Sequence, residues 1–187
     1  MGKLVIFSAP SGSGKTTIVR ELLKKFPQFE FSVSATSRAP RGKERNGIDY
    51  FFLTAEQFRE AVREDKFVEW EEVYSGTCYG TLRSEVERIW QKGNVIVFDV
   101  DVIGGLNLKR IFDDQACAIF IMPPSIDTLR ERLIHRGTDS PETIDCRVAK
   151  AEFELTKAPG FDHIVINDDL AEAIEETTRI ISDFLKR

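Results

Sequence analysis

The 187 residues correspond to about one compact domain, and a composition of 42% hydrophobic and 30% charged residues excludes a disordered chain. A net charge of −5 disfavours nucleic acid and acidic membranes as partners, so an anionic ligand needs a local basic site. Three widely spaced cysteines, at positions 78, 117 and 146, argue against a disulfide framework, and no run approaches the ~18 apolar residues of a membrane span. We therefore expect a cytoplasmic monomer or homo-oligomer without nucleic-acid or membrane partners.

Four short apolar runs predict buried strands. They are Leu4 to Phe7, Val95 to Phe98, Cys117 to Met122 and Ile164 to Ile166. Their hydrophobicity is nearly continuous, and amphipathic helical stretches lie between them, which is typical of parallel strands covered by helices on both faces. The predicted fold class is therefore α/β.

Local signals mark the ends of three helices. Ser140 followed by Pro141 has the pattern of an N-cap and an N1 proline, and Thr54 with Gln57 resembles a capping box. Gly93 fits the position just after the C-terminus of a helix that ends near residue 92.

The region from about Phe29 to Gly80 has a different pattern. Phe29, Phe31 and Val33 alternate with polar residues, and residues 50–52 form a second β-like run. We interpret this region as a small, partly antiparallel insertion into the α/β core.

Residues 8–17, SAPSGSGKTT, follow the first strand and precede a helical pattern, which is the order of a phosphate-binding P-loop. Glycines at two positions let amide N–H groups turn toward phosphate oxygens at a helix N-terminus. Lys15 is expected at the β and γ phosphates, and the Thr16 hydroxyl at Mg²⁺. Ala9 replaces the usual first glycine, and we expect it to be tolerated. The expected ATP contacts of this loop are Ala9, Pro10, Ser11, Gly12, Ser13, Gly14, Lys15, Thr16 and Thr17.

Two aspartates end the second core strand. The run VIVFDVD places Asp99 at the carboxyl edge of the sheet beside the P-loop, with Asp101 following. Such an acid can hold a water of the Mg²⁺ ion or a substrate group, and an ordinary strand-end aspartate is the alternative.

Residues 36–52 form a second basic segment. Arg38 and Arg41 lie three residues apart and Tyr50 follows them. Guanidinium forks pair with phosphate oxygens and a tyrosine hydroxyl adds a donor, so this set suits a phosphomonoester. From charge alone, a solvated basic loop remains the alternative.

These motifs resemble the guanylate kinase family, whose TSRxxRxxExxGxxYxF pattern the chain matches without a gap. The similarity covers essentially the whole chain and includes the pair Glu69 and Trp70, YGT at 79–81, RGTDS at 136–140 and NDDL at 167–170. It implies a P-loop kinase core with a parallel sheet flanked by helices (residues 1–32, 91–125 and 148–187). It also implies a small mixed α/β GMP-binding subdomain (33–90) and a helical lid (126–147).

The resemblance also implies where GMP binds. Glu69 can accept both N1–H and the exocyclic amine of guanine, whereas adenine offers neither donor in that arrangement. Without the resemblance, Glu69 in EWEEV reads as part of a solvated face. The implied guanine contacts are Ser34, Glu69, Thr81 and Asp99, and the implied phosphate contacts are Arg38, Arg41, Tyr50 and Tyr79.

Arginines gather in the segment from Ser125 to Arg147. Arg132 and Arg136 lie on one helical face and Arg147 in the next helix, an arrangement that favours an anion between them. The resemblance implies that Arg136 and Arg147 contact phosphates and that Arg132 lies near the adenine. Exposed salt bridges are the alternative for these arginines, to Glu131, Asp139 or Asp145. Asn167 resembles an adenine-side contact, and an asparagine that closes a strand is its alternative.

The implied activity is reversible transfer of the ATP γ-phosphoryl group to GMP, and to dGMP, in purine nucleotide metabolism. Mg²⁺ is the implied cofactor, and the implied catalytic residues are Lys15, Arg38, Arg136 and Arg147. A kinase for another nucleoside monophosphate and a non-catalytic domain that binds phosphorylated peptides are the rivals. The latter is disfavoured by the intact P-loop, and a GTPase by the lack of an NKxD motif. Two departures from the family pattern are Cys78, expected to alter packing only, and Ile103, which replaces a common glutamine.

Overall fold

The computed structural model describes residues 2–74, 76–137 and 139–187, and its core is a five-stranded sheet. The strand order is β2-β7-β1-β8-β9, and every pair is parallel. The strands are β1 (Leu4–Ser8), β2 (Phe29–Phe31), β7 (Val95–Asp99), β8 (Ala116–Met122) and β9 (His163–Ile166). The four predicted core strands and the α/β class are confirmed.

The two edge strands correct the sequence interpretation. The residue pattern alone placed β2 in the antiparallel insertion, whereas the bounds implied by the resemblance put residues 1–32 in the core. Phe29 pairs in parallel with Val95, so β2 is an edge of the core sheet. Its residues alternate because its two faces differ: Phe29 is buried on one face, and Glu30 on the other face pairs with Arg88 and Lys92. At the other edge, Ile164 and Ile166 of β9 are 40% and 56% exposed, so this strand is not fully buried as expected.

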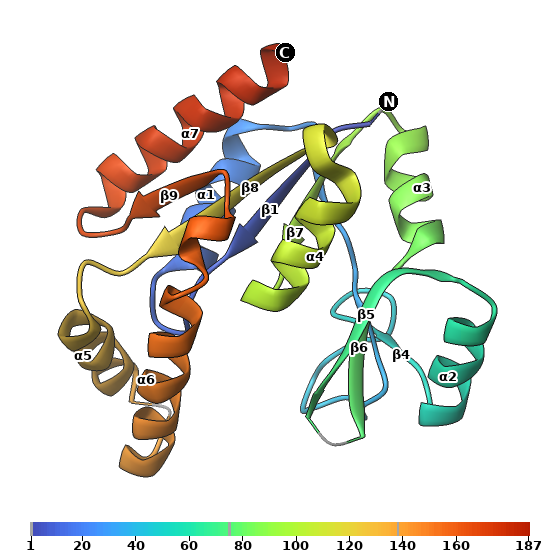
Figure 1. The fold of residues 1–187 in the computed structure, drawn as a ribbon, viewed down its shortest axis with the longest axis horizontal. Helices are drawn as coiled ribbons and strands as arrows, with labels where there is room; N and C mark the ends of the chain where they lie inside the picture. The colour runs from blue at the N-terminus through green and yellow to red at the C-terminus, as the bar shows by residue number, and fades with distance from the viewer. Residues whose placement is uncertain (1, 75, 138) are drawn as a thin grey trace.

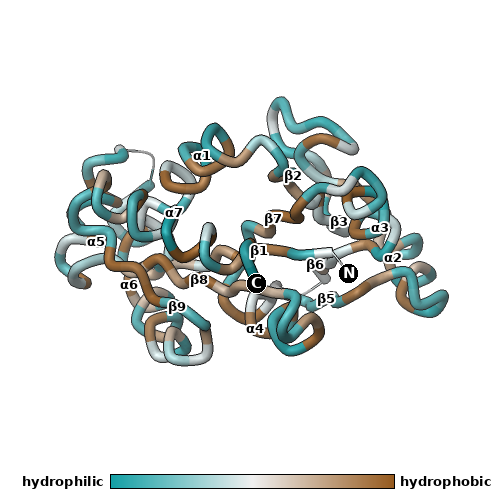
Figure 2. The backbone as a smooth tube through the Cα atoms, turned by 90° about the horizontal axis from the view of Figure 1, so that it is seen from above, coloured by the Kyte–Doolittle hydropathy of each residue, from teal (hydrophilic) through white to brown (hydrophobic). Residues whose placement is uncertain are grey.

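Helices cover both faces of the core sheet, as predicted (Figure 1). α1 (Lys15–Lys25) and α7 (Leu170–Lys186) pack on the face that includes Val5 and Phe7. α3 (Arg83–Gln91) and α4 (Val102–Phe112) pack on the face that includes Leu4 and Ile6. Figure 2 shows the hydrophobic colour along β7 and β8 in the middle of the molecule and hydrophilic colour around the peripheral α2.

A second, four-stranded sheet has the order β4-β3-β6-β5. Its strands are β3 (Ala35–Thr36), β4 (Phe51–Phe52), β5 (Phe67–Tyr74) and β6 (Thr77–Leu82). β3 and β4 are parallel and the other pairs are antiparallel, in agreement with the predicted partly antiparallel insertion. α2 (Ala55–Arg63) packs on this sheet, and its predicted capping box between Thr54 and Gln57 is confirmed.

The helices α5 (Ile126–Arg136) and α6 (Pro141–Leu155) form a pair with an apolar cluster of its own, which includes Leu129 and Ile144. The Ser140 side chain caps α6, as predicted, and Gly93 has a φ of 75° just after α3. Two 3₁₀ turns, η1 (Asp113–Gln115) and η2 (Ala158–Gly160), complete the described elements. Among the described residues, no helix combines the length and apolar character that crossing a membrane requires.

The α5–α6 pair and the second sheet lie beyond the same end of the core sheet, on opposite sides of α4 (Figure 1). Both follow carboxyl ends of parallel strands, where α/β proteins bind their ligands. The fold therefore concentrates the predicted site residues at this end of the molecule.

Candidate active site

The loop between β1 and α1 has the backbone geometry of a phosphate-binding loop. Gly12 and Gly14 have φ angles of 94° and 89°, a region that favours glycine. A Cβ atom on Gly14 would lie 2.2 Å from Asn167 Nδ2, which donates a hydrogen bond of 2.7 Å to the Ser13 carbonyl. Gly14 thus leaves room for Asn167 to brace the loop. The Thr17 N–H donates to the Gly14 carbonyl at 3.1 Å, whereas the N–H groups of Lys15 and Thr16 have no intrahelical acceptor within the described chain and are available to an anion.

Lys15 lies at the junction between this loop and the second sheet. Its Nζ is 2.5 Å from Asp99 Oδ1 and donates to the Val100 carbonyl at 3.2 Å. Phe7 and Asp99 are register partners on neighbouring strands, so β1 and β7 bring lysine and aspartate together. Thr16 and Thr17 are exposed in the first turn of α1.

Two arginines of the α5–α6 pair reach the loop region. Arg147 Nη1 donates to Ser11 Oγ at 2.7 Å, and Arg132 Nη2 donates to the Asn167 carbonyl at 2.9 Å. Arg132 Nη1 and Arg147 Nε are buried and have no hydrogen-bond partner among the described residues. Unpaired buried donors are costly, so both guanidiniums are suited to receive an acceptor.

The salt bridges weighed as an alternative are present in part. Arg147 Nη2 is 3.1 Å from Asp139 Oδ1, and Asp145 pairs with Arg130 at 2.6 Å. Arg136 is exposed in the last turn of α5. Within the described parts of the chain it makes no hydrogen bond or ion pair with the loop, so the structure does not bring it to the other site residues.

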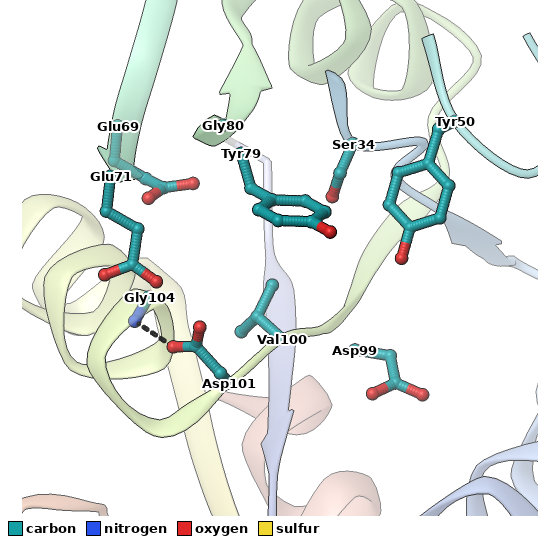
Figure 3. A pocket seen from close by; sticks show the side chains of 10 residues that line it. All are labelled: Ser34, Tyr50, Glu69, Glu71, Tyr79, Gly80, Asp99, Val100, Asp101 and Gly104. Carbon is teal, nitrogen blue, oxygen red and sulfur yellow. Dashed lines mark hydrogen bonds between the residues drawn. The ribbon is translucent and has the colours of Figure 1, made fainter. Parts of the chain in front are cut away.

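The second sheet and the end of β7 enclose a pocket of about 220 Å³ (Figure 3). The predicted residues Ser34, Tyr50, Glu69, Tyr79 and Asp99 line it. Thr81, also predicted, is fully buried and does not line the pocket. Its Oγ1 donates to Glu69 Oε1 at 2.8 Å. The remaining lining residues are Glu71, Gly80, Val100, Asp101 and Gly104.

A register shift of the β-bulge type in β5 turns Glu69 into this pocket. Phe67 pairs with Leu82 and Glu69 with Thr81, so β5 has one more residue than β6 between these pairs. As a result Phe67 and Trp70 both face Phe58 of α2. Their ring centroids lie 4.5 and 6.3 Å from the centroid of the Phe58 ring. Glu69 then lies on the opposite side of the strand from these rings.

Burial raises the pKa of Glu69, and the charge of Asp101 adds to the rise, while the hydrogen bond from Thr81 opposes it. A half-buried carboxylate with one oxygen already bonded to Thr81 still has free acceptor positions. These acceptor positions of Glu69 suit a ligand that carries N–H donors.

Arg38 is held by partners on several sides. Its Nη1 and Nη2 donate to the Glu44 carboxylate at 2.6 and 2.8 Å, and its Nε donates to Tyr79 Oη at 3.2 Å. The guanidinium also lies 4.9 Å from the centre of the Tyr50 ring. This hydrogen bonding lowers the pKa of Glu44 to about 2. Arg41 has an exposed side chain, and its backbone N–H donates to Glu44 at 2.7 Å.

Sequence reasoning did not single out Glu44, which holds Arg38, or Glu71, which lines the pocket. Glu44 was visible only as the acid of the matched pattern, six residues after Arg38. Glu71 lies two residues after Glu69 and therefore on the same side of β5, a signal that the EWEEV run contained. Of the two departures, Cys78 packs against the apolar cluster of the second sheet, and Ile103 is 39% exposed on α4.

Comparisons with known proteins give a consistent result. A family model described as guanylate kinase matches residues 1–184. A guanylate kinase of Bacteroides thetaiotaomicron is 54% identical over 100% of this chain and 91% of its own length. A guanylate kinase of Porphyromonas gingivalis is 51% identical over 100% of both chains. The crystal structure of a guanylate kinase from Anaplasma phagocytophilum superposes with a TM-score of 0.73 at 30% identity, covering 99% of this chain and 85% of that one.

Proposed function

The chain belongs to the guanylate kinase family and catalyses ATP-dependent phosphorylation of GMP, and we propose that its two sites divide that reaction between them. ATP binds at the loop before α1, and GMP binds in the pocket of about 220 Å³. The observation that carries this assignment is the Glu69 carboxylate, which is fixed by Thr81 and has free acceptors on the pocket side.

The guanine ring occupies the part of the pocket that Glu69 lines. Its carboxylate accepts N1–H and one hydrogen of the 2-amino group, while Ser34 and Asp99 line the pocket around the base. Thr81, which is buried behind the pocket wall, acts by holding Glu69 in position. A purine without these donors would leave a buried carboxylate unpaired, a loss that such sites use to discriminate by up to ~10⁴-fold.

The phosphate of GMP binds to Tyr50 and Tyr79, which line the other part of the pocket, and to the arginines beside them. Arg38 is already oriented by Glu44 and by Tyr79, so little conformational freedom is lost when the phosphate arrives. Arg41, which is exposed, and Tyr50 supply further donors.

ATP binds with its phosphates against residues 9–17, beside Lys15, Arg132, Arg147 and Asn167. A GMP phosphate oxygen attacks the γ-phosphorus, the bond from that phosphorus to the β–γ bridging oxygen breaks, and ADP leaves. Lys15, Arg147 and, after closure of the α5–α6 lid, Arg136 neutralise charge on the transferring group. The separate apolar cluster of the α5–α6 pair supports its movement as a unit.

The residues at the P-loop fit a Mg²⁺ ion that arrives with the nucleotide. Thr16 offers an exposed hydroxyl and Asp99 a carboxylate able to bind a water of the ion, and hard oxygen ligands of this kind suit Mg²⁺. Among the described residues, no group of three or more His, Cys, Asp or Glu side chains could hold a metal without the nucleotide. When bound, Mg²⁺ supplies positive charge to the β and γ phosphates.

The proposal extends to the organisation and setting of the protein. The P-loop core comprises residues 1–32, 91–125 and 148–187, the GMP-binding subdomain 33–90, and the lid 126–147. The α6 helix runs through the boundary at 147. Three free cysteines support a reducing, cytoplasmic setting, where the enzyme acts on GMP and dGMP in purine nucleotide metabolism.

A coupled assay of ADP formation tests the proposal. The purified chain receives MgATP with GMP, dGMP, AMP, UMP or CMP separately, and a Lys15→Ala variant measures contaminating kinases. We expect turnover with GMP and dGMP and loss of that turnover in the variant. Comparable turnover with AMP, UMP or CMP would contradict the assignment of the pocket to guanine.

A further inference from the structure

Two stretches of chain connect the core sheet to the second sheet within the described residues. One leads from β2 to β3. The other passes from β6 directly into α3, because β6 ends at Leu82 and α3 begins at Arg83. α3 in turn packs on the core sheet through Val86 and Ile89 (Figure 1). Any change in the angle between the two sheets must therefore bend the chain in these two stretches.

Val33 is the residue at which the first connection passes from one sheet to the other. The N–H of Ser32, before it, donates to a carbonyl of β7 at 3.0 Å, and the carbonyl of Ser34, after it, accepts from an N–H of β4 at 2.9 Å. Between these two anchors, the Val33 N–H donates to Glu85 Oε1 of α3 at 3.1 Å. The Glu85 side chain thus ties the first connection to the second.

The Glu85 carboxylate is held firmly where it meets Val33. Glu85 is 3% exposed in the first turn of α3, where the helix N-terminus favours a negative charge. Arg88 Nε donates to its Oε2 and Arg88 Nη2 to its Oε1, both at 2.8 Å. Burial opposes ionisation of Glu85, but the hydrogen bonds from Arg88 and Val33 outweigh it and lower its pKa. Glu85 is therefore a charged, buried acceptor that is fixed from two sides.

The Val33 junction adjoins the GMP pocket. Ser34, directly after Val33, lines the pocket from the second sheet, whereas Asp99 and Val100 line it from the end of β7 in the core. The pocket therefore spans both sheets, and a loose junction would spread the distance between its two walls. The proposed ATP-binding residues lie on the core and on the α5–α6 pair, so this junction does not divide them.

We propose that Glu85 is a positioning residue for GMP, whose hydrogen bond to the Val33 N–H fixes the junction between the two sheets and so holds the two walls of the GMP pocket at their binding distance. Glu85 acts through Val33 and touches neither nucleotide. The inference rests on the proposed placement of GMP in this pocket and adds to it a residue outside the pocket.

The test uses substitutions in α3 of the full chain. Glu85→Met keeps the length of the side chain and removes the acceptor. Glu85→Gln keeps the oxygen that accepts from Val33 and from Arg88 Nη2, and loses only the acceptor for Arg88 Nε. Ile89→Val is the matched control, because Ile89 is fully buried on the same helix and its truncation lowers stability while Glu85 and Val33 stay in place.

Steady-state kinetics give kcat and the KM values for GMP and ATP, and hydrogen exchange followed by NMR gives the protection of the Val33 amide. We expect Glu85→Met to raise KM for GMP about tenfold, to leave KM for ATP within about twofold, and to speed exchange of the Val33 amide about tenfold. Glu85→Gln and Ile89→Val should keep KM for GMP within about threefold. A smaller folded fraction alone lowers kcat and leaves both KM values unchanged, so the rise in KM for GMP separates positioning from stability.

Four results would overturn the inference. They are a KM for GMP within about twofold of the wild type in folded Glu85→Met, an equal rise in KM for both substrates, unchanged exchange of the Val33 amide, and a rise in Glu85→Gln as large as in Glu85→Met. If circular dichroism shows that Glu85→Met does not fold, Glu85→Ala replaces it with the same expected result. Failure of the proposed GMP placement would instead appear as an unchanged KM for GMP in Glu69→Gln, whatever the variants at Glu85 do.

Discussion

Replacing Glu69 by glutamine tests how the pocket recognises its base. The variant keeps the size of the side chain, and its remaining oxygen still accepts from Thr81, at the 2.8 Å position that Glu69 Oε1 occupies. The other oxygen becomes an NH₂ group, so a donor faces the N–H donors of guanine. The change therefore removes acceptor capacity without removing the contact that positions the side chain.

The expected loss follows from the value of one hydrogen bond to a charged group. Such a bond contributes about 1.5–3 kcal/mol, which corresponds to an increase in KM for GMP of about tenfold to a hundredfold. The clash between donors places the result toward the upper end. Because the lost contact is made equally in the bound state and the transition state, kcat should change little.

The pH dependence of KM provides a second readout. Burial raises the pKa of Glu69, so its carboxylate takes up a proton at a higher pH than an ordinary glutamate does. The protonated form cannot accept both guanine donors, and KM for GMP should therefore rise as the pH falls toward this raised pKa. Glu69→Gln should lack this component, while the ionisation of the GMP phosphate affects both proteins alike.

The coupled ADP assay at several pH values measures both effects, with Glu72→Gln as the control from the same strand. A KM for GMP within twofold of the wild type would refute the assignment of Glu69 to the guanine edge. So would an acid limb of the KM profile that is identical in the wild type and Glu69→Gln.

Three further changes have defined outcomes. Gly14→Ala should weaken ATP binding in calorimetry and leave GMP binding intact, because its φ of 89° adds strain of about 1–2 kcal/mol and its Cβ displaces Asn167. Phe58→Ala should lower the free energy of unfolding in urea by about 3–5 kcal/mol, since this ring is 1% exposed. In thiol labelling, the exposed Cys146 should react in the native state, whereas Cys117, whose pKa burial raises to about 12, should react only on unfolding.

The sequence predicted the parts of the fold that depend on local pattern. The continuous apolar runs identified β1, β7 and β8 because these strands are buried on both faces. The same reasoning was wrong for β2 and for the exposure of Ile164 and Ile166, because the position of a strand at a sheet edge is a tertiary property. Alternation alone does not distinguish an edge of the core sheet from an antiparallel insertion.

The sequence predicted those site residues whose type is needed for phosphate binding. The glycines, Lys15 and the arginine–tyrosine segment had such signals in sequence. The contacts between residues that are distant in the sequence had no such signal. The ion pair of Lys15 with Asp99 and the hydrogen bond from Arg132 to the Asn167 carbonyl depend on strand order and on the docking of α5. Glu71 was overlooked because the run of acids in EWEEV resembles a solvated face.

Because of the extra residue in β5, the side chains that face the pocket depend on the number of residues in this strand. Because side chains alternate along a strand, deleting one residue between Phe67 and Glu69 would exchange the two sides of the remainder of β5. Trp70 would enter the pocket, and the glutamates would be pressed against Phe58. A single substitution in this strand changes the contacts of one side chain, whereas one deletion would move every later side chain of the strand to the opposite face. A deletion within β5 therefore changes which side chains face the pocket, whereas a change in the length of a loop outside β5 leaves this register as it is.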